Sequence, residues 1–135
     1  MTTSPLILLA AGGTGGHLFP AEALGVELMR RGYRVRLATD SRALRYSGLF
    51  SSKDMIDVVP SETVRSRTPW SLAYTGIKLV AGTAVALNLM RRLKPAAVVG
   101  FGGYPTLPPL IAARLFGIPG IIHDANDAHA VRGYA

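Results

Sequence analysis

The chain reads Leu6-Ile-Leu-Leu-Ala-Ala-Gly-Gly-Thr-Gly-Gly-His17 close to its beginning. Six uncharged aliphatic residues in a row are typical of a strand that is buried on both faces of a sheet. Residues 18–31 then carry apolar side chains at helical spacing and are followed by Gly32, a residue common just beyond a helix end. This stretch therefore predicts a buried strand, a glycine turn at residues 12–16 and a helix.

The same order of elements recurs along the rest of the chain. Alternating apolar and polar residues predict a strand at residues 33–39, and further strands are predicted at residues 55–59, 96–101 and 118–123. Helices are predicted at residues 41–50, 70–93 and 107–116, and Lys94-Pro95 ends the second of them. Strands that alternate with helices imply right-handed crossovers. We therefore expect residues 1–135 to form one domain, a doubly wound, parallel, Rossmann-like α/β sheet.

A second glycine turn, Gly102-Gly-Tyr-Pro105, follows the strand predicted at residues 96–101. If the strands take the order 3-2-1-4-5, strands one and four are neighbours at the topological switch point, where such sheets bind ligands. Both glycine turns then meet in one crevice. Their backbone N–H groups at helix starts suit a diphosphate, although the alternative is that the glycines only make tight turns.

The composition narrows the classes of partner and site. Fifteen Lys and Arg against eight Asp and Glu give a net charge of +7, which favours nucleic acid, an acidic membrane surface or a phosphorylated substrate. The absence of cysteine excludes disulfides and thiolate metal sites, and the three histidines lack metal-ligand spacing, so we expect no metal or cofactor. The start Met-Thr-Thr-Ser-Pro lacks the basic region of a signal peptide, and we expect a cytosolic location.

Other glycine-rich motifs fit the chain less well. No Gly-Lys-Ser/Thr is present, which excludes a P-loop. In a dinucleotide fingerprint the third glycine would stand where the chain has Leu18, although Asp40 could bind a ribose. Asp40 would more often cap the following helix, so a nicotinamide-dependent oxidoreductase is disfavoured. The stripe of basic and aromatic residues typical of nucleic-acid-binding modules is missing, and we expect no nucleic-acid partner.

Two histidines lie at the predicted crevice. His17 stands at the start of the first helix, where the positive end of the helix dipole favours a neutral imidazole that can accept a proton from a sugar hydroxyl. His123 ends the last predicted strand, with Asp124 and Asn126 just beyond it. The alternatives are a hydrogen-bonded structural role for His17 and turn chemistry around His123.

Four motifs occur together: Gly12-Gly-Thr-Gly-Gly-His-Leu-Phe-Pro20, Gly100-Phe-Gly-Gly-Tyr-Pro105, Gly117-Ile-Pro119 and Ile122-His-Asp-Ala-Asn126. In this order and spacing they closely resemble the MurG family of GT-B glycosyltransferases. The resemblance implies that the chain is the N-terminal, acceptor-binding half of such an enzyme, with a C-terminal donor-binding domain as its partner. The segment alone would then be catalytically silent, because the transition state is assembled between two domains.

The resemblance also implies a reaction. Family members transfer N-acetylglucosamine, with inversion, from UDP-N-acetylglucosamine to the C4 hydroxyl of undecaprenyl-diphosphate-linked muramoyl-pentapeptide, which turns lipid I into lipid II in peptidoglycan biosynthesis. The resemblance makes His17 the general base and requires no bound metal. It gives donor contacts to Thr14, Gly15, Gly16 and Asn126, and acceptor-diphosphate contacts to Gly12, Gly13, Gly102, Gly103 and Tyr104.

From Trp70 to Met90 the only charged residue is Lys78. A run of this length can span a membrane, but a buried crossover helix between two predicted strands fits it better. The resemblance implies a peripheral protein at the cytoplasmic face of the bacterial inner membrane. Its contacts with an anionic membrane surface would be Arg65, Arg67, Trp70, Leu72, Tyr74, Ile77 and Lys78. The alternative is that the apolar side chains pack on the sheet and the cations are solvated.

A non-catalytic function also remains open from the sequence. In this alternative the chain is a membrane-recruited, acceptor-binding subunit that works with a separate donor-binding chain, as in two-chain glycosyltransferases. Co-purification of a second Rossmann-like protein would favour it.

Overall fold

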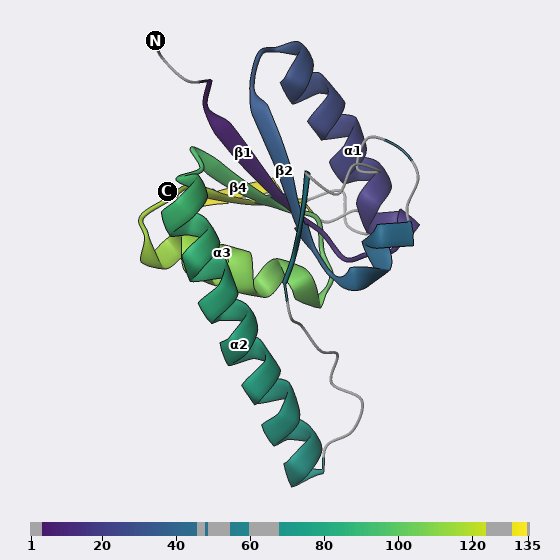
Figure 1. Ribbon diagram of the computed structural model, residues 1–135, viewed down its shortest axis with the longest axis vertical. Helices are drawn as coiled ribbons and strands as arrows, with labels where there is room; N and C mark the ends of the chain where they lie inside the picture. Colours follow the sequence, from purple (N-terminus) through teal and green to yellow (C-terminus); the bar gives the residue numbers. More distant parts are fainter. Residues whose placement is uncertain (1–3, 46–47, 49–54, 60–67, 124–130, 135) are drawn as a thin grey trace.

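The computed structural model describes residues 4–45, 48, 55–59, 68–123 and 131–134. Strands, α-helices and short 3-10 helices (η) follow one another along the chain (Figure 1). Their bounds are β1 Leu6–Ala10, α1 Gly15–Arg30, β2 Arg34–Thr39, η1 Ser41–Arg45, β3 Ile56–Val58, α2 Pro69–Leu93, β4 Ala97–Gly100, η4 Tyr104–Thr106, α3 Leu107–Leu115, β5 Gly120–His123 and β6 Val131–Tyr134.

The described strands form one sheet in the order β3-β2-β1-β4-β5-β6. Every pair from β3 to β5 is parallel, which confirms the predicted doubly wound order 3-2-1-4-5. The antiparallel edge strand β6 was not predicted, because its four residues Val-Arg-Gly-Tyr have neither an apolar run nor a clean alternation. The switch point of the topology lies between β1 and β4, at the ends of which the two glycine turns begin.

Alternate residues of each strand pack on opposite faces of the sheet, as the pleat requires. Ile7 and Leu9 of β1 pack with α1 on one face. Leu8 and Ala10 pack with α2 and α3 on the other face. Figure 1 shows α1 apart from α2 and α3, with the sheet between them. The central strand β1 is therefore buried on both sides, as its continuous apolar run predicted.

Two predicted helices differ from the observed ones. Of the helix expected at residues 41–50, the structure describes residues 41–45 and 48; Ser41–Arg45 form a 3-10 helix, and the other predicted positions lie outside the described residues. The first helix begins at Gly15 rather than at residue 18, because Thr14 has the extended backbone of an N-cap residue. Glycine has poor helix propensity, so the sequence concealed this earlier start. The consequence is that Gly15, Gly16 and His17 belong to the first turn of α1.

Helix α2 is much longer than the strands that it connects, and in Figure 1 its N-terminal half extends beyond the sheet. Its buried residues, Gly82, Ala86, Leu89 and Met90, all lie in its C-terminal half. Among the described residues, α2 is the one helix long and apolar enough to cross a membrane by length and composition. However, β3 before it and β4 after it belong to the same sheet, and a spanning helix would place them on opposite sides of the membrane. The crossover interpretation is therefore the one that fits this sheet.

The end of α2 offers a test of local backbone strain. Lys94 has φ 47° and ψ 57°, and it is the one non-glycine residue with positive φ in the described part of the chain. Left-handed backbone is costly for a residue with a Cβ and nearly free for glycine. We predict that Lys94→Gly raises the free energy of unfolding by about 0.5–1 kcal/mol. Arg92→Gly, inside the last turn of α2, should lower it by about 0.5–1 kcal/mol. Urea denaturation measures both, and equal effects of the two variants would contradict the strain at Lys94.

Candidate active site

The two glycine turns contact each other where β1 and β4 end. The N–H of Gly12 donates to the carbonyl of Gly102 over 3.1 Å. Gly102 and Gly103 have φ of 94° and 86°, a conformation that favours glycine. A Cβ at Gly103 would lie only 3.2 Å from the Cα of Gly12, so the backbones could not approach as closely with larger residues. The predicted convergence of the two turns in one place is therefore confirmed.

The imidazole of His17 lies between the two turns. Its Nδ1 is 3.0 Å from the carbonyl oxygen of Phe101, the residue just before the second turn. A carbonyl can only accept, so Nδ1 carries the hydrogen and, in the neutral ring, Nε2 holds the lone pair. A Cβ at Gly12 would lie 2.8 Å from the imidazole Cδ2, and one at Gly102 would lie 3.2 Å from Cε1. The ring is thus held in one orientation by backbone on both sides.

The backbone N–H groups of the first turn fall into two sets. Those of Gly12 and Gly13 are already used, by the Gly102 carbonyl and by the Asp40 carboxylate respectively. Those of Thr14, Gly15 and Gly16 have no hydrogen-bond partner within the described residues. They stand at the N-terminus of α1, where the helix dipole favours negative charge. The three groups are the ones in the first turn that can bind an anion directly.

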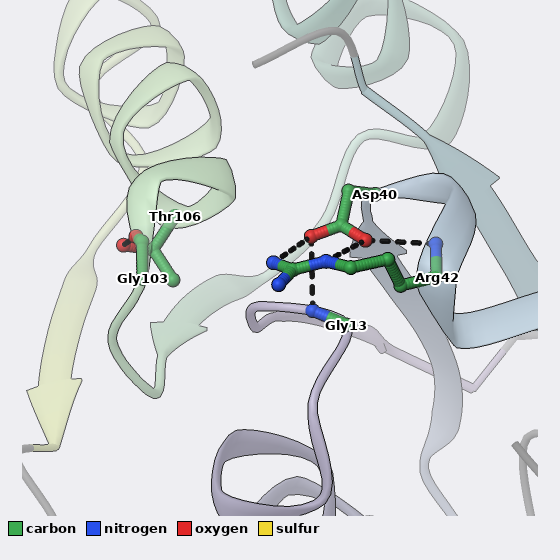
Figure 2. Close-up of polar contacts among 5 residues, drawn as sticks. All are labelled: Gly13, Asp40, Arg42, Gly103 and Thr106. Atoms are coloured by element: carbon green, nitrogen blue, oxygen red, sulfur yellow. Dashed lines mark hydrogen bonds and ion pairs between the residues drawn. The ribbon is translucent and has the colours of Figure 1, made fainter. Parts of the chain in front are cut away.

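The second turn is held by its own local bonds. Figure 2 shows Thr106 beside Gly103, and its hydroxyl donates to the Gly103 carbonyl over 2.7 Å. The N–H of Thr106 donates to the same oxygen over 3.2 Å. Tyr104, predicted to contact the acceptor diphosphate, begins η4, but its side chain lies outside the described part of the structure. These bonds fix the path of the chain from the second turn into α3.

Asp40, at the end of β2, makes the other contact with the first turn (Figure 2). Its Oδ2 accepts the N–H of Gly13 over 3.0 Å, and its Oδ1 accepts the N–H of Arg42 over 2.8 Å. The Arg42 guanidinium binds the same carboxylate through Nε and Nη2, at 3.0 and 2.6 Å. Asp40 therefore caps the start of η1. This is one of the two roles considered for Asp40 from the sequence, the other being ribose binding. Its link to Gly13 could not be seen from the sequence, because the two residues are 27 positions apart.

These contacts determine the protonation of Asp40. Burial by itself would raise the pKa of this carboxyl, but hydrogen bonds from the Arg42 guanidinium and from the backbone N–H groups of Gly13 and Arg42 outweigh it and lower the pKa. A carboxyl whose pKa is lowered by folding stabilises the fold above its ordinary value of 3.8. That contribution is lost as the pH falls through the lowered value. At neutral pH the carboxylate is ionised and the contact with Gly13 is intact.

Several other predicted residues lie around this centre or outside the described ranges. The His123 ring packs edge-on against the Phe101 ring, with 5.6 Å between centroids. Asn126, Arg65 and Arg67 lie outside the described residues. Within the described ranges, no group of three or more His, Cys, Asp or Glu side chains is arranged to hold a metal ion.

The predicted membrane-facing residues of α2 are mostly solvent-exposed. Trp70 is 76% and Ile77 67% exposed, and Leu72 and Tyr74 are also exposed. The ammonium of Lys78 lies 5.6 Å from the centroid of the Tyr74 ring, a cation–π contact. The structure therefore contradicts the alternative that these apolar side chains pack on the sheet.

Comparison with known proteins identifies the relatives of this chain. Residues 7–131 match the model of the glycosyltransferase family 28 N-terminal domain. Over its full length the chain is 82% identical to the UDP-N-acetylglucosamine–N-acetylmuramyl-(pentapeptide) pyrophosphoryl-undecaprenol N-acetylglucosamine transferase of Nitrobacter winogradskyi, and it covers 36% of that protein. It is 81% identical to the protein of the same name from Nitrobacter hamburgensis, of which it covers 35%. The chain thus spans about a third of the length of the curated relatives it matches.

Solved structures show the same fold. The crystal structure of Acinetobacter baumannii MurG is similar over 89% of this chain and 35% of that one, with 32% identity and a TM-score of 0.73. The Streptomyces glycosyltransferase SsfS6, complexed with thymidine diphosphate, has a TM-score of 0.61 at 21% identity, over 89% of this chain and 38% of that one. The second likeness shows only the shared fold. Together with the family match, these findings confirm the resemblance seen in the four sequence motifs.

Two glycines of the first turn, Gly13 and Gly16, offer a matched test of its packing. A Cβ at Gly13 would collide with the Asp40 carboxylate and lie 2.8 Å from the Arg42 Cβ and 2.9 Å from the Ala43 nitrogen. A Cβ at Gly16 would meet nothing within 4 Å. We predict that Gly13→Ala lowers the free energy of unfolding by about 1–3 kcal/mol through overpacking. Gly16→Ala should be neutral or stabilising by up to about 1 kcal/mol, because alanine favours the helix.

Thermal and urea unfolding of both variants beside the parent measure this difference. A Gly13→Ala variant as stable as Gly16→Ala would mean that the turn does not pack against the corner of β2 and η1.

Proposed function

This chain belongs to the glycosyltransferase family 28 N-terminal domain family, and on that basis we propose a function for the whole protein. The protein transfers N-acetylglucosamine from UDP-N-acetylglucosamine to undecaprenyl-diphosphate-linked muramoyl-pentapeptide, the lipid I to lipid II step of peptidoglycan biosynthesis. The observation that carries this proposal is the 82% identity, over the entire chain, to a transferase named for that donor and acceptor. The remaining two thirds of the protein supply the donor-binding domain.

The geometry of the first turn supports two different roles for its residues: some shape the turn and others bind the ligand. Gly12 and Gly13 shape the turn, since their N–H groups are bonded within the protein. The N–H groups of Thr14, Gly15 and Gly16, which have no partner in the described part of the chain, then bind phosphate oxygens, because the helix start offers both donors and positive potential. Gly102 and Gly103 let the second turn approach the first, so that one diphosphate can contact both. The net charge of +7 favours such an anionic substrate.

His17 acts as the general base in this proposal. Its Nδ1–H is held by the Phe101 carbonyl, which leaves Nε2 to accept the proton of the attacking sugar hydroxyl of the acceptor. The hydroxyl oxygen forms a bond to the anomeric carbon of N-acetylglucosamine, and the bond from that carbon to UDP breaks. UDP leaves with the bonding electron pair, and the proton remains on Nε2 of His17.

Activity is tested in a chimera, defined as this chain joined to the remaining two thirds of the Nitrobacter winogradskyi relative. Transfer of labelled N-acetylglucosamine to a lipid I analogue is the assay. We expect the chimera to be active and His17→Asn to lower kcat by about 10²–10⁴-fold, because general bases contribute rate factors of that order. Asparagine can still donate an N–H to the Phe101 carbonyl but has no basic nitrogen.

His123→Asn is the control, because within the described ranges His123 packs on Phe101 and makes no hydrogen bond to either turn. Its kcat should stay within about tenfold of the parent, well above that of His17→Asn. A His17→Asn variant with parental kcat would contradict the base role. A folded but inactive chimera would contradict the transferase itself and favour the acceptor-binding subunit.

We propose in addition that the protein is peripheral at the cytoplasmic face of the bacterial inner membrane, held by α2. The N-terminal half of α2 exposes Trp70, Leu72, Tyr74 and Ile77, with the cation of Lys78 among them. An exposed apolar surface with basic residues is suited to anionic headgroups and the acyl boundary. The acceptor in the proposed reaction is linked to a membrane lipid, so the protein must reach the membrane surface to bind it. Arg65 and Arg67 precede this helix in the sequence and would add positive charge.

Fluorescence provides the test, because Trp70 is the single tryptophan of the chain. We expect its emission to shift to the blue when the 135-residue chain is mixed with vesicles of phosphatidylglycerol and phosphatidylcholine. Phosphatidylcholine alone should give little shift, since each nearby basic residue contributes about 1 kcal/mol to binding anionic membranes. Ile77→Glu should abolish the shift, because it places a negative charge on the contact surface.

Val26→Glu is the matched control. Val26 is 52% exposed on α1, across the sheet from α2, so the same charge change there should leave vesicle binding intact. Equal loss of binding in the two variants would attribute the effect to net charge and contradict α2 as the contact surface.

A further inference from the structure

The first glycine turn is held from two opposite directions by two consecutive residues. On one side the N–H of Gly12 reaches the carbonyl of Gly102 in the second turn. On the other side the N–H of Gly13 reaches the carboxylate of Asp40, at the corner where β2 meets η1. The next residues, Thr14 and Gly15, start α1. Both bonds therefore determine where helix α1 begins and where His17, in the first helical turn of α1, is placed.

Asp40 is built to hold Gly13 firmly. Its side chain is only 16% exposed, and both of its oxygens accept a backbone N–H in addition to the Arg42 guanidinium. Hydrogen bonds to an ionised carboxylate are about twice as strong as those between neutral groups. The Arg42 side chain is 61% exposed, and its Nη2 donates to Oδ2, the same oxygen that accepts the N–H of Gly13 (Figure 2).

We propose that Asp40 is a positioning residue for the glycosyl transfer: by fixing Gly13 it places the free N–H groups of Thr14 to Gly16 and the imidazole of His17 against the second glycine turn. This inference rests on the proposed function. Asp40 touches neither the reacting atoms nor a bound substrate in this scheme. It acts through the backbone of the first turn, where a displacement of about 1 Å costs up to about 100-fold in rate.

The chain contains a matched control for a purely structural role. Asp57 on β3 binds the Arg36 guanidinium through both oxygens, at 2.8 and 2.9 Å, and its side chain is 13% exposed. It resembles Asp40 in burial and in pairing with an arginine. However, this pair joins β2 to β3 and includes no atom of either glycine turn. Loss of Asp57 therefore removes a similar ion pair without releasing Gly13.

The first experiment measures kcat and KM of the chimera and its variants at a temperature where all of them are folded. Asp40→Ala should lower kcat by about 10–100-fold with a change of less than about threefold in the KM for UDP-N-acetylglucosamine. Asp57→Ala should change both constants by less than about threefold, whatever it does to the melting temperature. Asp40→Asn keeps an acceptor oxygen for Gly13 and should recover kcat to within about fivefold of the parent.

The second experiment needs no substrate. Amide hydrogen exchange in the 135-residue chain should be about tenfold or more faster at Gly13, His17 and Leu18 in Asp40→Ala than in the parent, because these three amides are hydrogen-bonded and the local turn opens more often. Asp57→Ala should leave these amides at the parental rate.

The outcomes separate this inference from the proposed function. An active chimera in which Asp40→Ala and Asp57→Ala have equal kcat would overturn the positioning role and leave the transferase standing. Asp40→Asn as impaired as Asp40→Ala would assign the effect to the ion pair with Arg42, and it would also overturn the role through Gly13. An inactive chimera would contradict the proposed function, and the exchange rates alone would then decide whether Asp40 holds the turn.

Discussion

The close approach of two backbones at the switch point of the sheet is the constraint on which the rest of the site depends. The bond from Gly12 to Gly102 closes the gap between the ends of β1 and β4. It is possible only because neither turn carries side chains at the contact, where Gly103 would place a Cβ 3.2 Å from Gly12. The parallel sheet brings the two turns together, and their glycines decide how near they come.

Two side chains complete what the backbone begins. His17 enters between the turns and is oriented by the Phe101 carbonyl, so its tautomer is set by the main chain just beyond β4 rather than by another side chain. Asp40 reaches the first turn from the opposite side and occupies the N–H of Gly13. The division of the turn into bonded and unbonded N–H groups follows from these contacts. In the proposed function, the N–H groups at the start of α1 are the ones in the first turn that bind phosphate.

Much of this arrangement is predictable from the sequence because it is encoded locally. The run from Leu6 to Ala10 and the glycines that follow determine a buried strand and its turn, and the alternation of elements determines strand order. The four motifs also identify the family. The bond from Asp40 to Gly13 could not be predicted in this way, because it joins residues far apart in the sequence. A local role as the cap of η1 was already enough to explain an aspartate at position 40. The early start of α1 was not predicted because glycines occupy its first positions. Strand β6 was not predicted because its four residues show no strand pattern.

The two halves of helix α2 have different surroundings. Its C-terminal half buries Ala86, Leu89 and Met90 against the sheet, where a change of volume disturbs the packing of the core. Its N-terminal half, with Trp70 and Ile77, is exposed and lacks such packing neighbours among the described residues. Selection can therefore adjust the two halves separately. A lineage can alter the exposed end of this helix and inherit the buried end, and the fold with it, unchanged.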